Sequence, residues 1–263
     1  MITIQNYVRA KSLEEAYELN QKKGTYILGG MLWLRICNIH MNTAVDLCDL
    51  GLDGIEETKD CFRICAMTTL RSLELHEGLA VYTGGAMKKA VENIVGVQFR
   101  NLATVGGSIW GRYGFSDVLT MFLSMDTYVE LYHGGIIPLE QFCDMKYDRD
   151  LLVRVIIKKT PGCFAYTSMR NQSTDFPVLA MALSCIDDEY RLSVGARPGK
   201  AILLRDEKGL LKDGLTPEAI DAFAKDVAQR VPTGSNMRGS ADYRSCLVET
   251  LCDRALKTMK GDR

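Results

Sequence analysis

The sequence predicts an α+β protein built from three successive lobes. Its 263 residues are 47% hydrophobic, which provides enough apolar surface for one large domain or for two to three small ones. Helical and strand patterns alternate at first, whereas strands followed by two amphipathic helices fill the C-terminal part. Pro161–Gly162 is a natural boundary between these parts. We therefore expect a small βαβ lobe in residues 1–55, a larger α/β lobe in 56–160 and an α+β lobe in 161–263.

The first lobe begins with a helix whose start is marked by a capping box. Ser12 and Glu15 stand three residues apart, and apolar residues then recur at helical spacing up to Gly24. Two short runs typical of strands follow and enclose a helical turn, a pattern that indicates a small βαβ unit. In order, these are the strand "TYIL", the turn "MLWLRIC" and the strand "TAVDL".

The second lobe combines a hairpin, several helices and two longer strands around an unusually long glycine-rich loop. The loop precedes Ser116, and long loops in compact domains tend to be functional. The expected elements are the hairpin of "GIEET" with "FRICAM", the helix "TTLRSLELHEG" capped by Thr68 or Thr69, a glycine-interrupted helix in "AVYTGGAMKKAVENIV", a helix from about Ser116, and the strands "TYVELY" and "LLVRVIIKK".

The third lobe is expected to be a three-stranded antiparallel sheet with helices. Three apolar runs of strand length are followed by two sequences with the 3.6-residue period of amphipathic helices. The strands are expected in "FAYTSMR", "VLAMALSCIDD" and "YRLSVGA", and the helices in "PEAIDAFAKDVAQRV" and "ADYRSCLVETLCDRALKTM".

Charge and hydropathy exclude several classes of partner. With 32 basic against 33 acidic residues the net charge is -1, which offers no basic field for nucleic acid or for an anionic membrane. No apolar run reaches the roughly 18 residues of a membrane-spanning helix, and the N-terminal stretch lacks the apolar core of a signal peptide. We therefore expect a cytoplasmic protein without nucleic-acid or membrane partners.

The nine cysteines are expected to be reduced and to bind no metal. Their number is odd and they are scattered from Cys37 to Cys252. The closest pair, Cys61 and Cys65, lacks further cysteines or histidines nearby that would complete a four-ligand set. Paired carboxylates and Ser-His-Asp or Cys-His arrangements are also missing, so we expect no catalytic side chain of the protein's own.

Two glycine pairs are candidates for binding a diphosphate. Gly29–Gly30 follow the strand "TYIL", and Gly106–Gly107 lie in "TVGGS" between two hydroxyl residues, Thr104 and Ser108. Adjacent glycines can turn their backbone amides toward phosphate oxygens, and the hydroxyls can donate further hydrogen bonds. We therefore expect both bends to converge on one diphosphate.

Asp117 has two interpretations that spacing alone leaves open. Its carboxylate, close to the start of the expected helix, could accept hydrogen bonds from a sugar hydroxyl. With Ser116 it could equally cap that helix.

The stretch "GVQFRNLATVGGSIWGRYGFSDVLTMFLSMDTYVEL" resembles the FAD-binding subunit of the molybdenum hydroxylases, the family of xanthine dehydrogenase and carbon monoxide dehydrogenase. The family pattern is approximately Q-V-R-N-x-A-T-I-G-G-N, followed by S/G-D and L-x-A-L-D-A-x-V-x-L. The resemblance extends over nearly the whole chain, through "YILGGMLWLRI", "FRICAMTTLRSLE" and "SADYRSCLVETLCDRAL".

The resemblance implies a two-lobed FAD-binding domain of the PCMH/VAO-like type in residues 1–160. A C-terminal domain of the carbon monoxide dehydrogenase flavoprotein type would follow in 161–263. It further implies that the first bend and the second bend flank the FAD diphosphate, that Asp117 contacts a sugar and that Leu152 contacts the flavin. The implied cofactor-binding residues are Ile27, Leu28, Gly29, Gly30, Met31, Leu32, Trp33, Thr104, Gly106, Gly107, Ser108, Asp117 and Leu152.

The function implied by the resemblance is that of a FAD-carrying electron-transfer subunit of a multi-subunit molybdenum hydroxylase. A molybdopterin-binding subunit and a 2Fe-2S subunit would be its partners, and NAD+ or another acceptor would take the electrons. A stand-alone FAD reductase on the same framework is a further alternative.

Four positions depart from the family pattern. Met31 and Leu32 replace a threonine and an Asp or Asn, Ser108 replaces an asparagine, and Tyr166 stands where some members carry a lysine. Each lost hydrogen bond weakens binding by roughly 0.5–1.5 kcal/mol. We expect a weakened FAD site, with an FAD-free structural or assembly subunit as the alternative.

Overall fold

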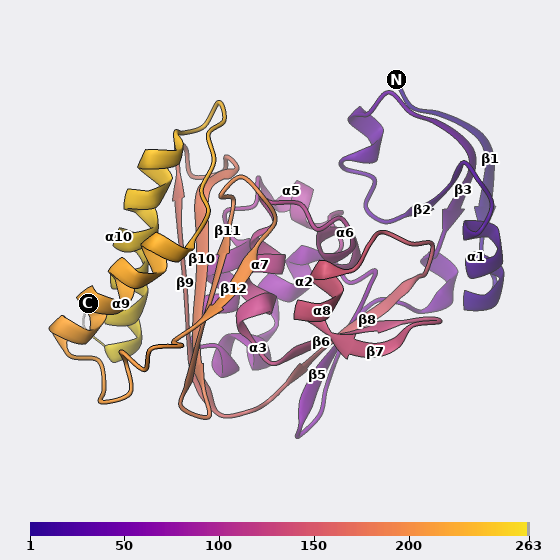
Figure 1. Cartoon of the computed structure of the whole chain (residues 1–263). Coiled ribbons are helices and arrows are strands. Elements are labelled where there is room, and N and C mark those ends of the chain that lie inside the picture. Colours follow the sequence, from indigo (N-terminus) through magenta and orange to yellow (C-terminus); the bar gives the residue numbers. More distant parts are fainter. Residues whose placement is uncertain (262–263) are drawn as a thin grey trace. The chain divides into compact units, whose positions relative to one another are not determined.

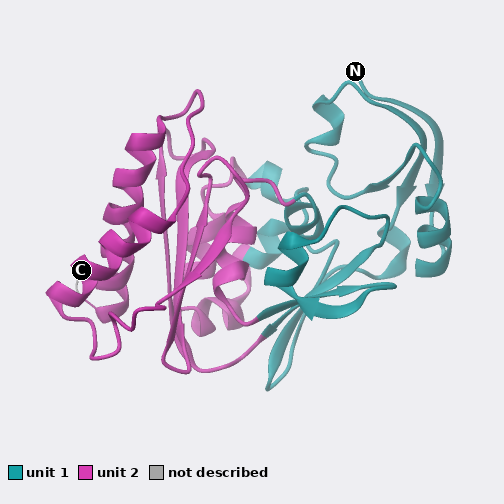
Figure 2. Ribbon diagram, viewed as in Figure 1, with its two compact units in different colours: residues 1–73, 97–111, 127–157 teal, residues 74–96, 112–126, 158–263 magenta. Residues whose placement is uncertain are grey.

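The computed structural model describes residues 1–261, which form two compact units (Figure 2). Unit 1 comprises residues 1–73, 97–111 and 127–157, and unit 2 comprises the remaining described segments, 74–96, 112–126 and 158–261. Each unit is described by itself below. The units do not follow the expected boundary at residue 160, because two segments of the N-terminal part belong to unit 2.

Unit 1 contains a parallel three-stranded sheet in the order β1-β3-β2. The strands are β1 (Thr3–Arg9), β2 (Thr25–Leu28) and β3 (His40–Asp46), and helix α1 (Leu13–Asn20) follows β1 (Figure 1). Ser12 caps α1 by accepting a 3.1 Å hydrogen bond from the amide of Glu15, as the capping box predicts. Short 3-10 turns η1 (Leu34–Ile36) and η2 (Cys48–Leu50) flank β3.

Strand β1 was absent from the elements expected in the first lobe. Six of its seven residues are exposed, so "TIQNYVR" lacks the alternation of apolar and polar residues that identifies a half-buried strand. The strand is instead held by its backbone pairing with β3, which runs from Thr3 opposite His40 to Arg9 opposite Asp46. The first lobe thus holds one parallel strand more than predicted.

The second sheet of unit 1 has five strands in the order β4-β5-β8-β6-β7. The expected hairpin is confirmed, because Ile55 on β4 lies opposite Ile64 on β5. Buried residues such as Val129 and Val155 alternate with partly buried ones along β6 and β8. The elements are β4 (Ile55–Glu57), β5 (Cys61–Cys65), β6 (Thr127–Leu131), β7 (Gly135–Pro138), β8 (Leu152–Lys158) and the helices α2 (Leu70–Leu75), α5 (Val97–Arg100), α6 (Val105–Trp110) and α8 (Leu139–Asp144).

Unit 2 is built on an antiparallel sheet in the order β12-β11-β10-β9, which has four strands rather than the three expected. The additional edge strand is the short β12 (Ile202–Arg205), which pairs with β11. It was not expected because its four residues, which follow a loop with Pro198 and Gly199, are too few to show the periodicity that identifies a strand. The other strands are β9 (Gly162–Arg170), β10 (Pro177–Ile186) and β11 (Glu189–Gly195).

Helices cover both faces of this sheet (Figure 1). On one face, α9 (Pro217–Arg230) and α10 (Ala241–Lys260) enclose an apolar core that includes Leu183, Phe223 and Val248. On the other, α4 (Ala86–Val91) packs against β9 and α7 (Asp117–Ser124) against β10. Helix α3 (Glu77–Tyr82) precedes α4, and Gly84 and Gly85 between them have positive φ, which confirms the predicted glycine interruption.

Arg244 on α10 is a buried arginine that ties the helix to neighbouring loops. It is 1% exposed, and its guanidinium donates to the carbonyls of Val178, Ala196, Gly234 and Gly239 and to Oδ1 of Asn236, at 2.6–3.2 Å. Neutral acceptors thus satisfy the group in place of a carboxylate, and burial lowers its pKa.

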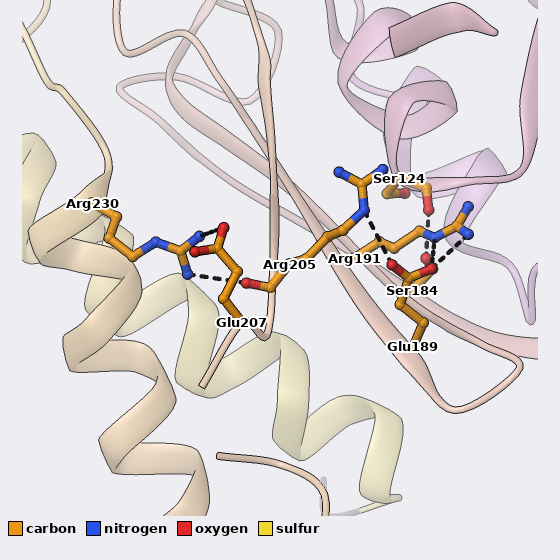
Figure 3. A network of polar contacts seen from close by, with 7 residues as sticks. All are labelled: Ser124, Ser184, Glu189, Arg191, Arg205, Glu207 and Arg230. Atoms are coloured by element: carbon orange, nitrogen blue, oxygen red, sulfur yellow. Dashed lines mark hydrogen bonds and ion pairs between the residues drawn. The ribbon is translucent and has the colours of Figure 1, made fainter. Parts of the chain in front are cut away.

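A network of polar contacts holds the outer strands of the same sheet (Figure 3). Glu189 accepts hydrogen bonds from Arg191 at 2.7 Å and from Arg205 at 3.1 Å. Arg230 donates to Glu207 at 2.6 Å and to the carbonyl of Arg205 at 3.0 Å, which joins α9 to the end of β12. In residues 1–261, no helix has both the length and the apolar character needed to cross a bilayer.

Candidate cofactor site

The two bends predicted from the glycine pairs pack against each other within unit 1. A Cβ atom on Gly30 would overlap the backbone carbonyl of Leu102, and one on Gly29 would lie 2.9 Å from Oγ1 of Thr104. Only glycine permits so close an approach of one backbone to another. The first bend (residues 29–32) is therefore seated directly on the segment that leads into the second pair.

The first bend presents a run of unused backbone donors. Among the described residues, the N–H groups of Gly29, Gly30, Met31 and Leu32 donate to no protein acceptor, although all four residues are partly buried. Met31 has a φ of 62°, a left-handed conformation that turns successive amides toward a common point. Partly buried N–H groups are normally paired, so this bend is suited to an anion.

Met31 also explains why an apolar residue can occupy a position where the family pattern has a polar one. Its side chain packs against the cluster of Leu28, Met41 and Ala44, while its amide stays available. Ile27 packs against a different apolar cluster, so the side chains at the end of β2 contribute to the apolar cores. Trp33 precedes the turn η1 and is 36% exposed.

The second glycine pair lies at the start of a helix, contrary to the long loop that was expected. Helix α6 begins at Val105, and its first amides are used within the chain. Val105 donates to the carbonyl of Thr68 at 2.8 Å, Gly106 to that of Ala66 at 2.7 Å and Gly107 to Oγ1 of Thr104 at 3.1 Å. The expectation that both bends aim their amides at one diphosphate is therefore corrected, because only the first bend has amides to spare.

Glycine is required at position 106 for packing. A Cβ there would lie 2.7 Å from the carbonyl oxygen of Ala66, the same atom that accepts the Gly106 amide. Ser108 is also committed, since its hydroxyl donates to the carbonyl of Thr104 at 2.9 Å. Its predicted role as a hydroxyl donor to phosphate is not available in this arrangement.

Thr104 is the residue of the second segment that keeps a donor. It is 7% exposed, and its Oγ1 accepts the Gly107 amide as the N-cap of α6. In the described chain its hydroxyl hydrogen has no acceptor, and the oxygen lies beside Gly29 of the first bend. The hydroxyl thus adds a fifth donor next to the four free amides.

Leu152 opens strand β8 opposite Leu131 and is 6% exposed. Its neighbours Leu151 and Val153 belong to one apolar core, and Leu152 does not, because successive side chains along a strand point to opposite faces of the sheet.

Asp117 belongs to unit 2, and its surroundings there show whether it is needed to cap the helix that it begins. Ser116 caps α7 by accepting the amide of Leu119 at 3.1 Å, so the cap does not need Asp117. Oδ1 of Asp117 accepts hydrogen bonds from the Tyr166 hydroxyl and, at 2.6 Å, from the Arg170 guanidinium. Asp117 thus takes part in a buried ion pair.

Burial is the main influence on the pKa values of this group. It raises the pKa of the Asp117 carboxyl, against the opposing effect of Arg170. Burial and the Asp117 charge together raise the pKa of Tyr166 well above its usual value, so the hydroxyl remains a donor. Arg170 was not predicted as a partner of Asp117, although Tyr166, Ser168 and Arg170 stand two residues apart in "FAYTSMR" and so share one face of β9.

The donor set of unit 1 fits the diphosphate of a dinucleotide cofactor. Four free amides lie in one partly buried bend, and one free hydroxyl lies beside it where glycine lets the two segments approach closely. Neutral N–H and O–H donors can satisfy non-bridging phosphate oxygens without a nearby lysine or arginine. Because the donors of the bend are backbone amides, they are unaffected by the presence of Met31 and Leu32 in place of the polar residues of the family pattern.

Comparisons with known proteins identify the family to which the chain is related. Residues 2–160 match the FAD binding domain in molybdopterin dehydrogenase, and residues 164–259 match the CO dehydrogenase flavoprotein C-terminal domain. The uncharacterized protein YgfM of Escherichia coli K12 is 26% identical over 94% of this chain and 93% of its own length. The xanthine dehydrogenase FAD-binding subunit of Escherichia coli O157:H7 is 25% identical over 97% and 96%.

Solved structures share the fold. Carbon monoxide dehydrogenase from Hydrogenophaga pseudoflava matches with a TM-score of 0.87 at 20% identity, over 100% of this chain and 99% of that one. Since the FAD-binding match spans more than half of the sequence, the chain belongs to the family of FAD-binding domains of molybdopterin dehydrogenases, a family of flavoprotein subunits of molybdenum hydroxylases.

Proposed function

We propose that the first bend binds the diphosphate of FAD through the amides of Gly29, Gly30, Met31 and Leu32. These amides are the unpaired donors of the bend, and a diphosphate offers several acceptor oxygens to a short run of them. The Thr104 hydroxyl completes the set from the neighbouring segment. Gly106 and Gly107 then act indirectly, by letting α6 pack where Thr104 can reach the bend.

Asp117 and Leu152 keep the roles that the family resemblance implies, as parts of this proposal. Oδ1 of Asp117 is occupied by Tyr166 and Arg170, so a sugar hydroxyl would be accepted by its other oxygen. The ion pair holds the carboxylate in one orientation, which favours a defined contact. Leu152 would offer an apolar surface.

We further propose that the chain is the electron-transfer subunit of a multi-subunit molybdenum hydroxylase. Bound FAD supplies the conversion between single electrons from a 2Fe-2S subunit and the electron pair taken up by NAD+ or another acceptor. A molybdopterin-binding subunit would be the second partner. Support comes from the family match and from a relative that is named as a subunit of xanthine dehydrogenase. The chain's own residues contribute binding and orientation of the cofactor.

The run of free amides in the first bend is the observation that carries the proposal. The test is a visible absorption spectrum of the purified chain, before and after incubation with FAD and removal of the unbound cofactor. We expect retained bands of oxidised flavin. Colourless protein that also shows no heat of binding in a calorimetric FAD titration would favour the FAD-free structural subunit.

Two further measurements address the partners and the acceptor. Affinity purification of the tagged chain from its native cells should recover a molybdopterin-binding chain and a 2Fe-2S chain, and recovery of the chain alone would favour a stand-alone reductase. Anaerobic addition of NADH to the FAD-loaded protein should bleach the flavin bands if NAD+ is the acceptor. Unchanged bands would point to another acceptor.

A further inference from the structure

Two cysteines of unit 2 face each other across neighbouring strands. Cys163 on β9 and Cys185 on β10 are direct partners in the antiparallel register, and both are free thiols. Cα atoms of such partners are about 4.5–5.5 Å apart. This spacing falls inside the ~4.4–6.8 Å window of disulfide bonds. The strands can therefore be joined through these residues without moving apart or sliding.

The two sulfur atoms lie on the same face of the sheet. Side chains alternate along each strand, so Cys163 shares a face with Ala165 and Cys185 shares one with Leu183. Ala165 and Leu183 are also partners in the register, and both belong to the core under α9 and α10. Cys163 is exposed and Cys185 partly buried, which leaves the pair open to small solutes at one side.

The register of this pairing is fixed by the long ladder between β9 and β10, which runs from Met169 opposite Leu179 to Gly162 opposite Ile186. Ser184, next to Cys185, donates to the carbonyl of Ser124 at 2.5 Å, and Arg191 opposite Ser184 is bound to Glu189 (Figure 3). A slip of one residue would bring these groups onto the apolar face. The thiols are thus kept opposite each other.

Tyr190 on β11 is the third member of the group. It lies opposite Cys185 in the register of β10 and β11. Burial raises the pKa of the Cys185 thiol, and a hydrogen bond with Tyr190 acts in the lowering direction. Burial and Cys185 raise the pKa of Tyr190 to about 12, so its hydroxyl stays protonated and can donate to a thiolate.

We propose that Cys163 and Cys185 form a peroxide-sensitive modification site that closes to a reversible cross-strand disulfide. The exposed Cys163 reacts first, as a peroxide oxidises its thiol to a sulfenic acid and is itself reduced, releasing water. The Cys185 sulfur then attacks the Cys163 sulfur, the S–S bond forms, and the sulfenic oxygen leaves as a second water molecule. Two hydrogens are lost in all, and a dithiol reductant restores both thiols.

The test uses the full chain treated with hydrogen peroxide and analysed by intact mass and peptide mapping. We expect the mass to fall by two hydrogens, two fewer thiols to react with an alkylating reagent, and a mapped link between Cys163 and Cys185. Dithiothreitol should reverse all three changes. A link elsewhere, or oxidation of Cys163 to sulfinic or sulfonic acid without any link, would overturn the proposal.

Three variants separate the roles of the thiols. Cys185→Ser should leave Cys163 as a sulfenic acid that dimedone traps, and Cys163→Ser should form no link. Cys246→Ser, which removes an exposed cysteine on α10, is the matched control and should close the disulfide at the wild-type rate. Loss of the link in the control, or no dimedone adduct on Cys163 in Cys185→Ser, would contradict the assignment.

Discussion

The two glycine pairs of unit 1 look alike in sequence and differ in what their backbones do. At Gly29–Gly30 the amides are free and glycine clears space for a neighbouring carbonyl. At Gly106–Gly107 the amides are consumed by a helix cap and by Ala66, and glycine serves only close packing. A glycine pair therefore indicates a phosphate site only where its backbone N–H groups have no acceptor within the protein.

The largest expected effect on FAD binding comes from Gly30→Ala. The added Cβ would overlap the Leu102 carbonyl, and because a backbone group cannot turn away, the first bend must shift. Overpacking of this kind costs about 1–3 kcal/mol, so FAD should bind up to about 100-fold more weakly. Calorimetric titration of the folded variant measures this, and wild-type affinity would show that the first bend does not hold the cofactor.

Thr104→Val should have the next largest effect. It removes the free hydroxyl donor and the N-cap of α6, so we expect about tenfold weaker FAD binding. Stability should fall by about 0.5–2 kcal/mol. Thr104→Ser retains both functions and is the matched control. Flavin fluorescence quenching gives the affinities, and equal values for Val and Ser would remove Thr104 from the donor set.

Gly106→Ala tests whether the second glycine pair serves packing alone. A Cβ 2.7 Å from the Ala66 carbonyl should lower the free energy of unfolding by about 1–3 kcal/mol, as measured by urea denaturation. FAD affinity, however, should stay within about threefold, less than 1 kcal/mol, because no free donor is lost. A loss of binding as large as that of Gly30→Ala would mean that the two pairs act alike after all.

The smallest effect is expected for Ser108→Ala. The Ser108 hydroxyl donates to the carbonyl of Thr104 within the helix, so its removal should change stability by no more than about 0.5 kcal/mol. FAD affinity should remain at the wild-type value. A tenfold loss would show that the hydroxyl turns to the cofactor on binding.

Much of the architecture could be predicted from local pattern. The capping box at Ser12, the hairpin of β4 and β5 and the glycine break before α4 follow from residue types at fixed spacing. Strands β1 and β12 could not be found in this way. Strand β1 is almost wholly exposed and depends on pairing with β3, about 37 positions later, and β12 is only four residues long.

For the candidate site, residue spacing identifies candidate residues but does not show which of their donors are free. Spacing brought Gly29 and Thr104 to attention, and the structure places them in contact range. Whether an amide is free depends on where Ala66 and Thr68 place their carbonyls, which no local motif encodes. The partners of Asp117 likewise come from β9, some fifty positions later in the chain.

Hydrogen–deuterium exchange with and without FAD tests the central claim most directly. Amides of residues 29–32 should exchange quickly in the free protein and become protected by FAD, whereas those of residues 105–108 should be protected in both states. Protection gained only at residues 105–108, with residues 29–32 unchanged, would contradict the account.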